Sequence, residues 1–164
     1  MSQTAYSLNM PAFAHEGALA DAGENDVVSA LAEIAIPFGK FVKRGTDKEN
    51  QVLLPGAAID VTTLANVAGV ALHDQAREQV ASGTPGYVLK EAVSVLRKGR
   101  FVAKAEQLCV AGDPVFVRFV AGGEGVGSFG NTAGTSERAL LAQAVWTKGA
   151  AAAGLGVIEI NLPA

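Results

Sequence analysis

Six residues in the second half of the chain have the spacing of a dinucleotide-binding loop. Residues 125–130, GVGSFG, spell G-x-G-x-x-G, and an apolar run at 115–120 precedes them. In such loops the glycines let the backbone approach a pyrophosphate, and a helix opening at the third glycine holds its charge. Here Glu124 places a carboxylate where the phosphates would arrive, and residues 131–134 are turn-forming. The sequence therefore predicts a mobile surface loop between two strands, with no cofactor.

Side chains that could act as base, nucleophile or metal ligand are few and scattered. His73 and Asp74 could be a base and its orienting acid, but neighbours on a strand point to opposite faces. No nucleophile-elbow sequence G-x-S-x-G accompanies the candidate nucleophiles, which are Ser82, Ser94 and Ser128. His15 and His73, with one cysteine, are too few ligands for a structural zinc site.

The remaining candidates fit packing better than chemistry. Cys109 lies between two apolar residues and is predicted to pack as a small hydrophobic side chain. Trp146 is predicted to lie in a core or an interface. The acidic run at 24–26 could touch a cation only weakly and has no resemblance to a calcium loop. We therefore predict no catalytic, cofactor-binding or metal-binding residue, and a protein that is not an enzyme.

Composition favours a protein that associates with others. The 164 residues suggest one domain, and 49% are hydrophobic while only 18% are charged. Much of the apolar content is alanine, so the surface must be apolar enough to accept partners. A net charge of −3 without a basic run argues against nucleic acid. No apolar run approaches the roughly 20 residues that cross a membrane, and no signal peptide is visible.

Short apolar runs punctuated by glycine and proline predict an all-β fold. About eight or nine short strands would form a small barrel or a jelly-roll-like sandwich over residues 27–164. Residues 1–26 read as an extended N-terminal arm. Residues 27–36 fit helix and strand equally well.

Four local features are predicted within that domain. The segment 65–74 contains a glycine and is read as a strand with a bulge. Residues 87–106 contain two apolar runs joined at Lys98-Gly99, which predicts a hairpin. Pro114 should open a strand, where a missing N–H costs least. The run at 157–162 should be the terminal strand.

The order of these motifs resembles that of a known family. VSVLRKGRFVAKAEQLCVAGDPVFVRFVAGG (93–123), the glycine-rich loop after it and AQAVW (142–146) resemble the structural cement, or capsid decoration, proteins of tailed bacteriophages. IPFGKFVKRG (36–45) and AGVALHD (68–74) also fit that pattern. The resemblance extends from about residue 20 to the C-terminus.

The resemblance implies a virion protein without catalytic residues or cofactor. Such a protein would bind the outside of the major capsid protein shell as a dimer or trimer and bridge capsomers against internal pressure. The arm (1–26) and the loop 121–138 are then the expected adaptable contacts. The alternative hypothesis is a carbohydrate- or cell-surface-binding β-domain on the virion, which would need exposed aromatic side chains.

Overall fold

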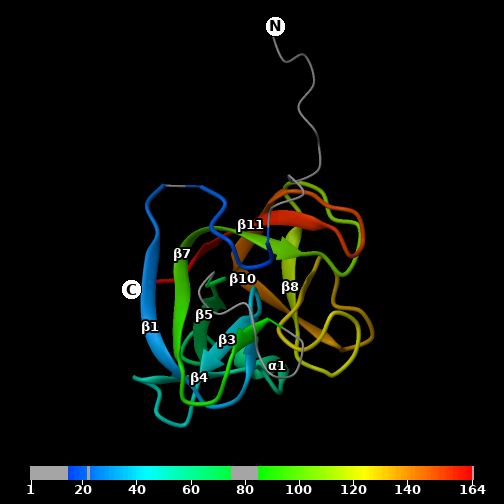
Figure 1. The fold of residues 1–164 in the computed structure, drawn as a ribbon. Coiled ribbons are helices and arrows are strands. Elements are labelled where there is room, and N and C mark those ends of the chain that lie inside the picture. The colour runs from blue at the N-terminus through cyan, green and yellow to red at the C-terminus, as the bar shows by residue number, and fades with distance from the viewer. Residues whose placement is uncertain (1–14, 22, 75–84, 164) are drawn as a thin grey trace, which may run out of the picture.

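The computed structural model describes residues 15–21, 23–74 and 85–163, and these form an almost entirely β structure (Figure 1). The elements are β1 (Asp26–Ala32), β2 (Ile36–Pro37), β3 (Phe41–Arg44), β4 (Gln51–Leu53), α1 (Ala58–Thr62), β5 (Val67–Ala71), β6 (Gly86–Tyr87), β7 (Ala92–Lys104), β8 (Pro114–Arg118), β9 (Phe129–Gly130), β10 (Arg138–Lys148) and β11 (Leu155–Asn161). The predicted all-β class is confirmed. The ambiguous segment 27–36 begins as a strand.

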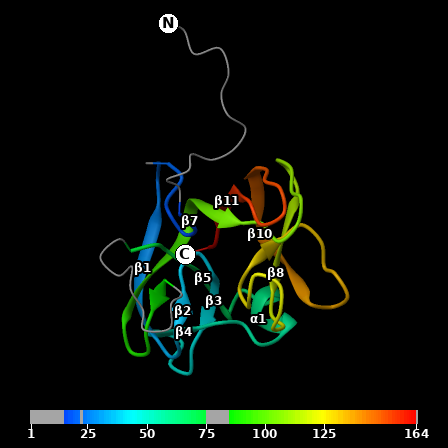
Figure 2. The same cartoon turned by 45° about the vertical axis from the view of Figure 1, so that its right-hand side comes forward.

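One long strand, β7, joins two parts of the fold. The main sheet has the order β1-β4-β3-β5-β7-β11-β10-β8-β9, and β1 pairs additionally with β7. That extra pairing closes β1, β4, β3, β5 and β7 into a small barrel. The other strands continue the sheet from β7 toward β8, away from β1 (Figures 1 and 2). The short strands β2 and β6 pair with each other.

The two faces of β7 are buried in two separate apolar cores. Val95 lies in the core inside the barrel, and its neighbour Leu96 lies in the larger core between the barrel wall and β8, β10 and β11. Both side chains are fully buried. Since successive side chains point to opposite faces, a strand buried on both sides needs consecutive apolar residues. This is why β7 contains consecutive buried apolar residues, Val95-Leu96 in its first half and residues 101–103 in its second half.

The hairpin predicted at Lys98-Gly99 is wrong, because residues 92–104 form one continuous strand. Gly99 has φ +136°, and a Cβ added there would lie 2.0 Å from Oδ1 of Asn25. At this point β7 changes partners, since its first half pairs with β1 and its second half, from Lys98, pairs with β11. Gly99 therefore allows Asn25 to approach the backbone of a continuous strand. In the sequence, a glycine with this role cannot be distinguished from a glycine in a turn.

The described half of the expected N-terminal arm lies on the domain. The N–H groups of Gly17 and Ala20 donate to carbonyls of β7, and the N–H of His73 donates to the carbonyl of Gly17. Leu19 forms an isolated bridge with Phe101. Residues 15–20 therefore extend the pairing along the second half of β7. The remainder of the expected arm, residues 1–14 and residue 22, lies outside the described residues.

Several local predictions are confirmed. Pro114 is the first residue of β8, and β11 is the last strand. The register between β3 and β5 passes from Val42 opposite Gly69 to Lys43 opposite Val67, which leaves Ala68 as the bulged residue. The predicted connection 74–86 lies largely outside the described residues.

No pattern in the sequence indicated α1, which is a single short helical turn. The carboxylate of Asp60 accepts hydrogen bonds from the N–H groups of Gly56 and Ala57, at 2.8 and 3.0 Å. Lys43 Nζ lies 2.9 Å from the same carboxylate. Local capping and one ion pair therefore hold this turn, which is too short for helical periodicity. No helix in the described part of the chain has the length and apolar content needed to cross a membrane.

The substitution Gly69→Ala should destabilise the barrel. A Cβ there would lie 2.2 Å from the carbonyl oxygen of Leu96, and the backbone has φ +150°. We expect a loss of roughly 2 kcal/mol or more in the free energy of unfolding, since β5 and β7 must move apart. Gly112→Ala is the matched control, because Gly112 also has positive φ, +94°, but open space around it. Equal losses in denaturant titrations of the two variants would contradict the close-approach explanation.

Candidate functional site

The centre of the glycine-rich loop is packed into the protein. Residues 127–130 are buried, and Phe129 pairs with Val117 of β8. The N–H of Phe41 donates to the carbonyl of Gly127, and a Cβ on Gly127 would lie 2.9 Å from the carbonyl oxygen of Phe41. The prediction of a mobile loop is therefore wrong for this central part, because its glycines permit close packing against β3. Exposed residues flank it at 121–123 and 132–136.

The loop does not have the geometry of a dinucleotide cradle. Gly130, where the fingerprint requires a helix to begin, is the last residue of β9, and the chain then turns into β10. Glu124 Oε2 lies 2.5 Å from Lys104 Nζ, so the carboxylate is held at the loop by an ion pair. Without a helix N-terminus this loop lacks the charge-stabilising element of such sites.

A buried carboxylate fixes the base of this loop. The side chain of Glu106 is 4% exposed and lies between two arginines, Arg118 at 2.6 Å and Arg138. The second guanidinium nitrogen of Arg118 also reaches Glu137 at 3.1 Å. Burial by itself raises the pKa of Glu106, but the hydrogen bonds from Arg118 and Arg138 outweigh it, so the pKa lies below its ordinary value of 4.5.

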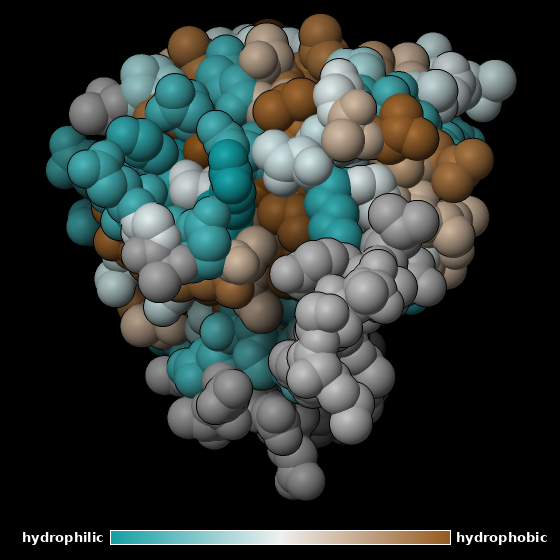
Figure 3. All heavy atoms as spheres, turned by 90° about the horizontal axis from the view of Figure 1, so that it is seen from above, coloured by the Kyte–Doolittle hydropathy of each residue, from teal (hydrophilic) through white to brown (hydrophobic). Residues whose placement is uncertain are grey.

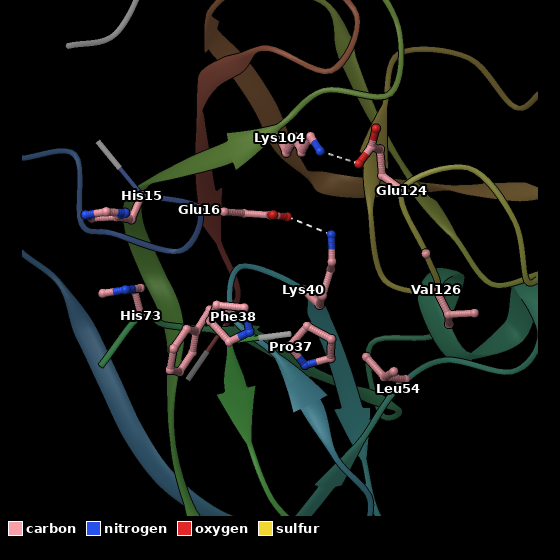
Figure 4. A pocket seen from close by; sticks show the side chains of 12 residues that line it. His15, Glu16, Pro37, Phe38, Lys40, Leu54, His73, Lys104, Glu124 and Val126 are labelled. Carbon is pink, nitrogen blue, oxygen red and sulfur yellow. Dashed lines mark hydrogen bonds and ion pairs between the residues drawn. The ribbon is translucent and has the colours of Figure 1, made fainter. Parts of the chain in front are cut away.

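A pocket of about 490 Å³ lies where the N-terminal segment, the start of β3, the end of β7 and the glycine-rich loop meet (Figure 4). Glu16 points toward Lys40, with 2.7 Å between Oε1 and Nζ, and Lys104 points toward Glu124. The apolar part of the lining comes from Pro37, Phe38, Leu54 and Val126. Because each lysine has its own carboxylate, these pairs join four chain segments and leave the pocket without an excess of either charge.

His73 lines this pocket, but the structure does not place it in a catalytic arrangement with the candidate serines. Its ring stacks on His15 at 5.0 Å between centroids and packs edge-on against Phe38. Ser128 is fully buried, and its hydroxyl donates to the carbonyl of Gly125. Ser94 lies within β7, where its N–H donates to the Tyr87 hydroxyl. The third candidate, Ser82, lies outside the described residues.

Cys109 and Trp146 are packing residues, as predicted. Cys109 is buried, and burial raises the pKa of its thiol to about 11, so the reactive thiolate is scarce at neutral pH. Trp146 is fully buried, and its indole N–H donates to the carbonyl of Gly130. Tyr87 is also buried, and no aromatic residue belongs to the exposed large hydrophobic residues of the described ranges.

The acidic run at 24–26 is spread over different contacts. Glu24 is almost fully exposed and lies 3.6 Å from Lys98, while the side-chain amide of Asn25 donates to the carbonyl of Gly23. Within the described ranges, no group of three or more histidine, cysteine, aspartate or glutamate side chains could hold a metal ion.

The most exposed large apolar side chains beside the glycine-rich loop are Leu108 and Val110, which are 68% and 57% exposed. The carbonyl of Leu108 accepts a hydrogen bond from Asn131, and Gln107 donates to Thr132. These bonds place the two apolar side chains next to the exposed segment 132–136. We call this surface, made of Leu108, Val110 and residues 132–136, the loop face.

A second apolar group lies at the end of the barrel where β1 leads into β2. The short pair β2–β6 consists of Ile36 with Tyr87 and Pro37 with Gly86, and Ile34 and Leu89 lie just outside it, in a bend and a turn. Both side chains are exposed, as are Leu31 and Val88. On the face seen in Figure 3, hydrophilic side chains gather on the left, and hydrophobic ones are more frequent at the centre and on the right, outside the region that grey atoms cover. Surface apolar residues are therefore concentrated on particular elements.

Sequence reasoning missed the ion pairs and both apolar groups. Glu106, Arg118 and Arg138 are far apart in sequence, so nothing local identifies them as partners. A weak signal for the apolar surface did exist. The segment DVVSALA (26–32) has apolar residues at both odd and even positions, so apolar side chains lie on both faces of this strand.

Comparisons with known proteins identify relatives of this chain. A family model described as "Structural cement protein (E217 gp24/Pam3 gp6)" matches residues 1–161. A chain of a solved structure entitled "The capsid of Myoviridae Phage XM1" has the same fold, with a TM-score of 0.71 and 17% identity, over 93% of this chain and 91% of that chain. No curated protein matches this chain.

The substitution Glu106→Gln should destabilise the protein by roughly 2–3 kcal/mol at neutral pH, because the buried guanidinium of Arg138 loses the charge of Glu106 and that of Arg118 keeps only the more exposed Glu137. Since the folded-state pKa of Glu106 is lowered, its contribution is present above pH 4.5 and is lost as the pH falls through that lowered pKa. The stability difference between wild type and variant should therefore shrink in acid. Denaturant titrations between pH 3 and pH 7 measure this.

Glu159→Gln is the control for that experiment. Glu159 pairs with Arg100 at 2.7 Å, but both side chains are close to half exposed. Solvent screens such a pair, so its removal should leave the denaturation midpoint nearly unchanged at every pH. A Glu106→Gln variant as stable as this control would show that the buried network does not hold the loop.

Proposed function

Because this chain belongs to the structural cement protein family of phages, we propose that it binds the outer surface of a major capsid protein shell and bridges neighbouring capsomers. The match of the family model over residues 1–161 carries the proposal. A capsid cement or decoration role is the function of the family, which is a class of structural proteins. The fold shared with a chain of a phage capsid structure agrees with this role.

The loop face is the surface that we assign to the shell. Exposed leucine and valine side chains lose contact with water on binding, and burial of each contributes on the order of 1 kcal/mol or more. The adjacent segment 132–136 offers small and polar residues, TAGTS, that can hydrogen-bond with a partner. The Glu106 network and the buried centre of the loop hold this surface in place, so little conformational entropy is lost on binding.

Residues 1–14 are the second contact that we assign to the shell. The segment MSQTAYSLNMPAFA contains no charged side chain, but it contains Tyr6, Leu8, Met10 and Phe13. Its C-terminal end is anchored at Gly17, which bonds to β7 and to His73. An apolar segment attached to a fixed point can extend the contact onto a neighbouring capsomer, and linked contacts add through effective concentration.

Deletion of residues 1–14 should weaken shell binding without unfolding the domain. The truncated protein retains the backbone hydrogen bonds of Gly17 and Ala20 to β7. We expect an unchanged melting temperature of the free protein and about tenfold weaker co-sedimentation with shells of the cognate major capsid protein. A longer deletion, of residues 1–20, should also lower the melting temperature. Undiminished shell binding by the shorter truncation would remove the segment from the proposal.

The substitution Leu108→Lys should weaken shell binding by about tenfold or more, because a charge then enters an apolar contact. Ile59→Lys is the matched control, since Ile59 lies on α1 and is 61% exposed, close to the 68% of Leu108. Co-sedimentation with shells and the melting temperature of the complexed shells are the measurements. If wild type neither sediments with shells nor raises their melting temperature, the proposed function is wrong. Equal effects of the two lysines would contradict the assignment to the loop face.

A further inference from the structure

The outer edge of β1 is open over most of its length. On one side, β1 pairs with β7 from Asp26 to Leu31. On the other side, β4 reaches only the end of the strand, where it pairs with Leu31 and Ala32. Residues 26–30 therefore have β7 as their one strand neighbour in the described part of the chain.

The direction of the backbone groups follows from hydrogen bonds at the end of β1. The N–H of Leu31 donates to the carbonyl of Asn50 on the β4 side. The N–H of Ala32 donates to the carbonyl of Glu91 on the opposite side. In a strand paired in antiparallel fashion, the N–H and C=O of one residue point to the same side, and successive residues alternate. Odd-numbered residues of β1 therefore direct their backbone groups away from β7.

Two residues consequently present a donor and an acceptor at the open edge, Val27 and Ser29. The pairing on β7 agrees, because the carbonyl of Ser94 accepts from Leu72 on the β5 side, which leaves Val93 and Val95 to bond the even residues of β1. An open edge with such groups is a template for another strand. Natural edges are usually protected by proline or lysine, and DVVSALA contains neither.

A groove runs beside this edge. It has a volume of about 170 Å³ and lies between Val28, Ser29 and Ala30 on one side and Arg44 and Lys48 on the other. Its lining also includes apolar residues of the barrel interior, Val52 and Val95. Val28 itself is 38% exposed and Val27 43%, so apolar side chains border the groove. The lining also carries Arg97 and one carboxylate, Glu49, so the groove offers unpaired backbone groups, apolar side chains and an excess of cations to one extended segment.

We propose that this edge binds the β1 strand of a second copy of the chain, in antiparallel fashion around a two-fold axis at Val28. In this register Val27 of each copy faces Ser29 of the other. Each such pair exchanges an N–H···O=C bond in both directions, and the axis produces two pairs. The Val28 side chains of the two copies lie directly opposite each other at the centre, where antiparallel side chains are closest.

Charge supports a second copy as the occupant. The same register places Asp26 of one copy opposite Ala30 of the other, at a groove whose lining carries three cations, Arg44, Lys48 and Arg97, against one carboxylate, Glu49. The centre of the strand, from Val27 to Ala30, is uncharged, so no like charges meet there. A two-fold interface is isologous and requires one surface to complement itself, and this edge does so in its backbone groups, side chains and charges. Other extended peptides would satisfy the backbone alone.

Two substitutions test the interface in the free protein, so the result is independent of shell binding. Ser29→Pro removes an N–H that points to the open edge and leaves the bonds to β7 intact. Val28→Lys places two ammonium groups opposite each other on the axis. Sedimentation equilibrium should show a wild-type dimer at tens of micromolar and a dissociation constant raised about tenfold or more in both variants. Thermal melting establishes that each variant is folded. If only one of the two variants folds, that variant alone is enough to test the interface.

Leu140→Lys is the control, because Leu140 is exposed to a similar degree, 43%, but lies on β10. It should remain dimeric. A wild type that is monomeric or trimeric at those concentrations would overturn the proposal. Folded β1 variants with the wild-type dissociation constant, or a control that dissociates as they do, would overturn it as well. A dimer that fails to bind shells would instead count against the proposed function alone.

Discussion

The backbone of β7 has to be satisfied along both edges, and the architecture of the protein follows from that requirement. Its first half bonds β1 on one edge and β5 on the other. Its second half bonds β11 on one edge and residues 17–20 on the other. An unpaired peptide group in a buried strand costs on the order of 1–3 kcal/mol, so each of these partners is needed. Both faces of β7 are also buried, which fixes the barrel and the second group of strands against each other.

Sequence reasoning succeeded where the determinants were local. Pro114 opens β8 because proline lacks the N–H that an interior strand position needs, and this rule applies in any fold. The bulge in β5 and the terminal strand had similar local signals. The order of such motifs along the chain sufficed to indicate the family, although each motif alone is common.

Failures occurred where distant residues decide the outcome. Gly99 lies between two apolar runs, as a hairpin glycine does, but the approach of Asn25 requires it within a continuous strand. The glycine-rich loop appeared mobile because its composition is that of flexible segments, yet Glu106 and two arginines from other elements hold its base. Neither contact leaves a periodic pattern. Only the folded chain brings these residues together. Amino-acid composition therefore could not indicate that the centre of the glycine-rich loop is well packed.

The positions of the loop face and of the proposed β1 interface are consistent with a bridging role. In Figures 1 and 2, β1 lies at one side of the molecule and β8 at the opposite side. The loop face is on the β8 side, because Asn131 bonds both Leu108 and Asp113, next to the start of that strand. A dimer joined through β1 therefore has its two loop faces at its outer ends. On the proposed function, such a dimer would contact the shell at two separate points, and the second contact would form within an already bound molecule. Weak apolar contacts, each carried by few side chains, would then suffice for the proposed bridging of two capsomers.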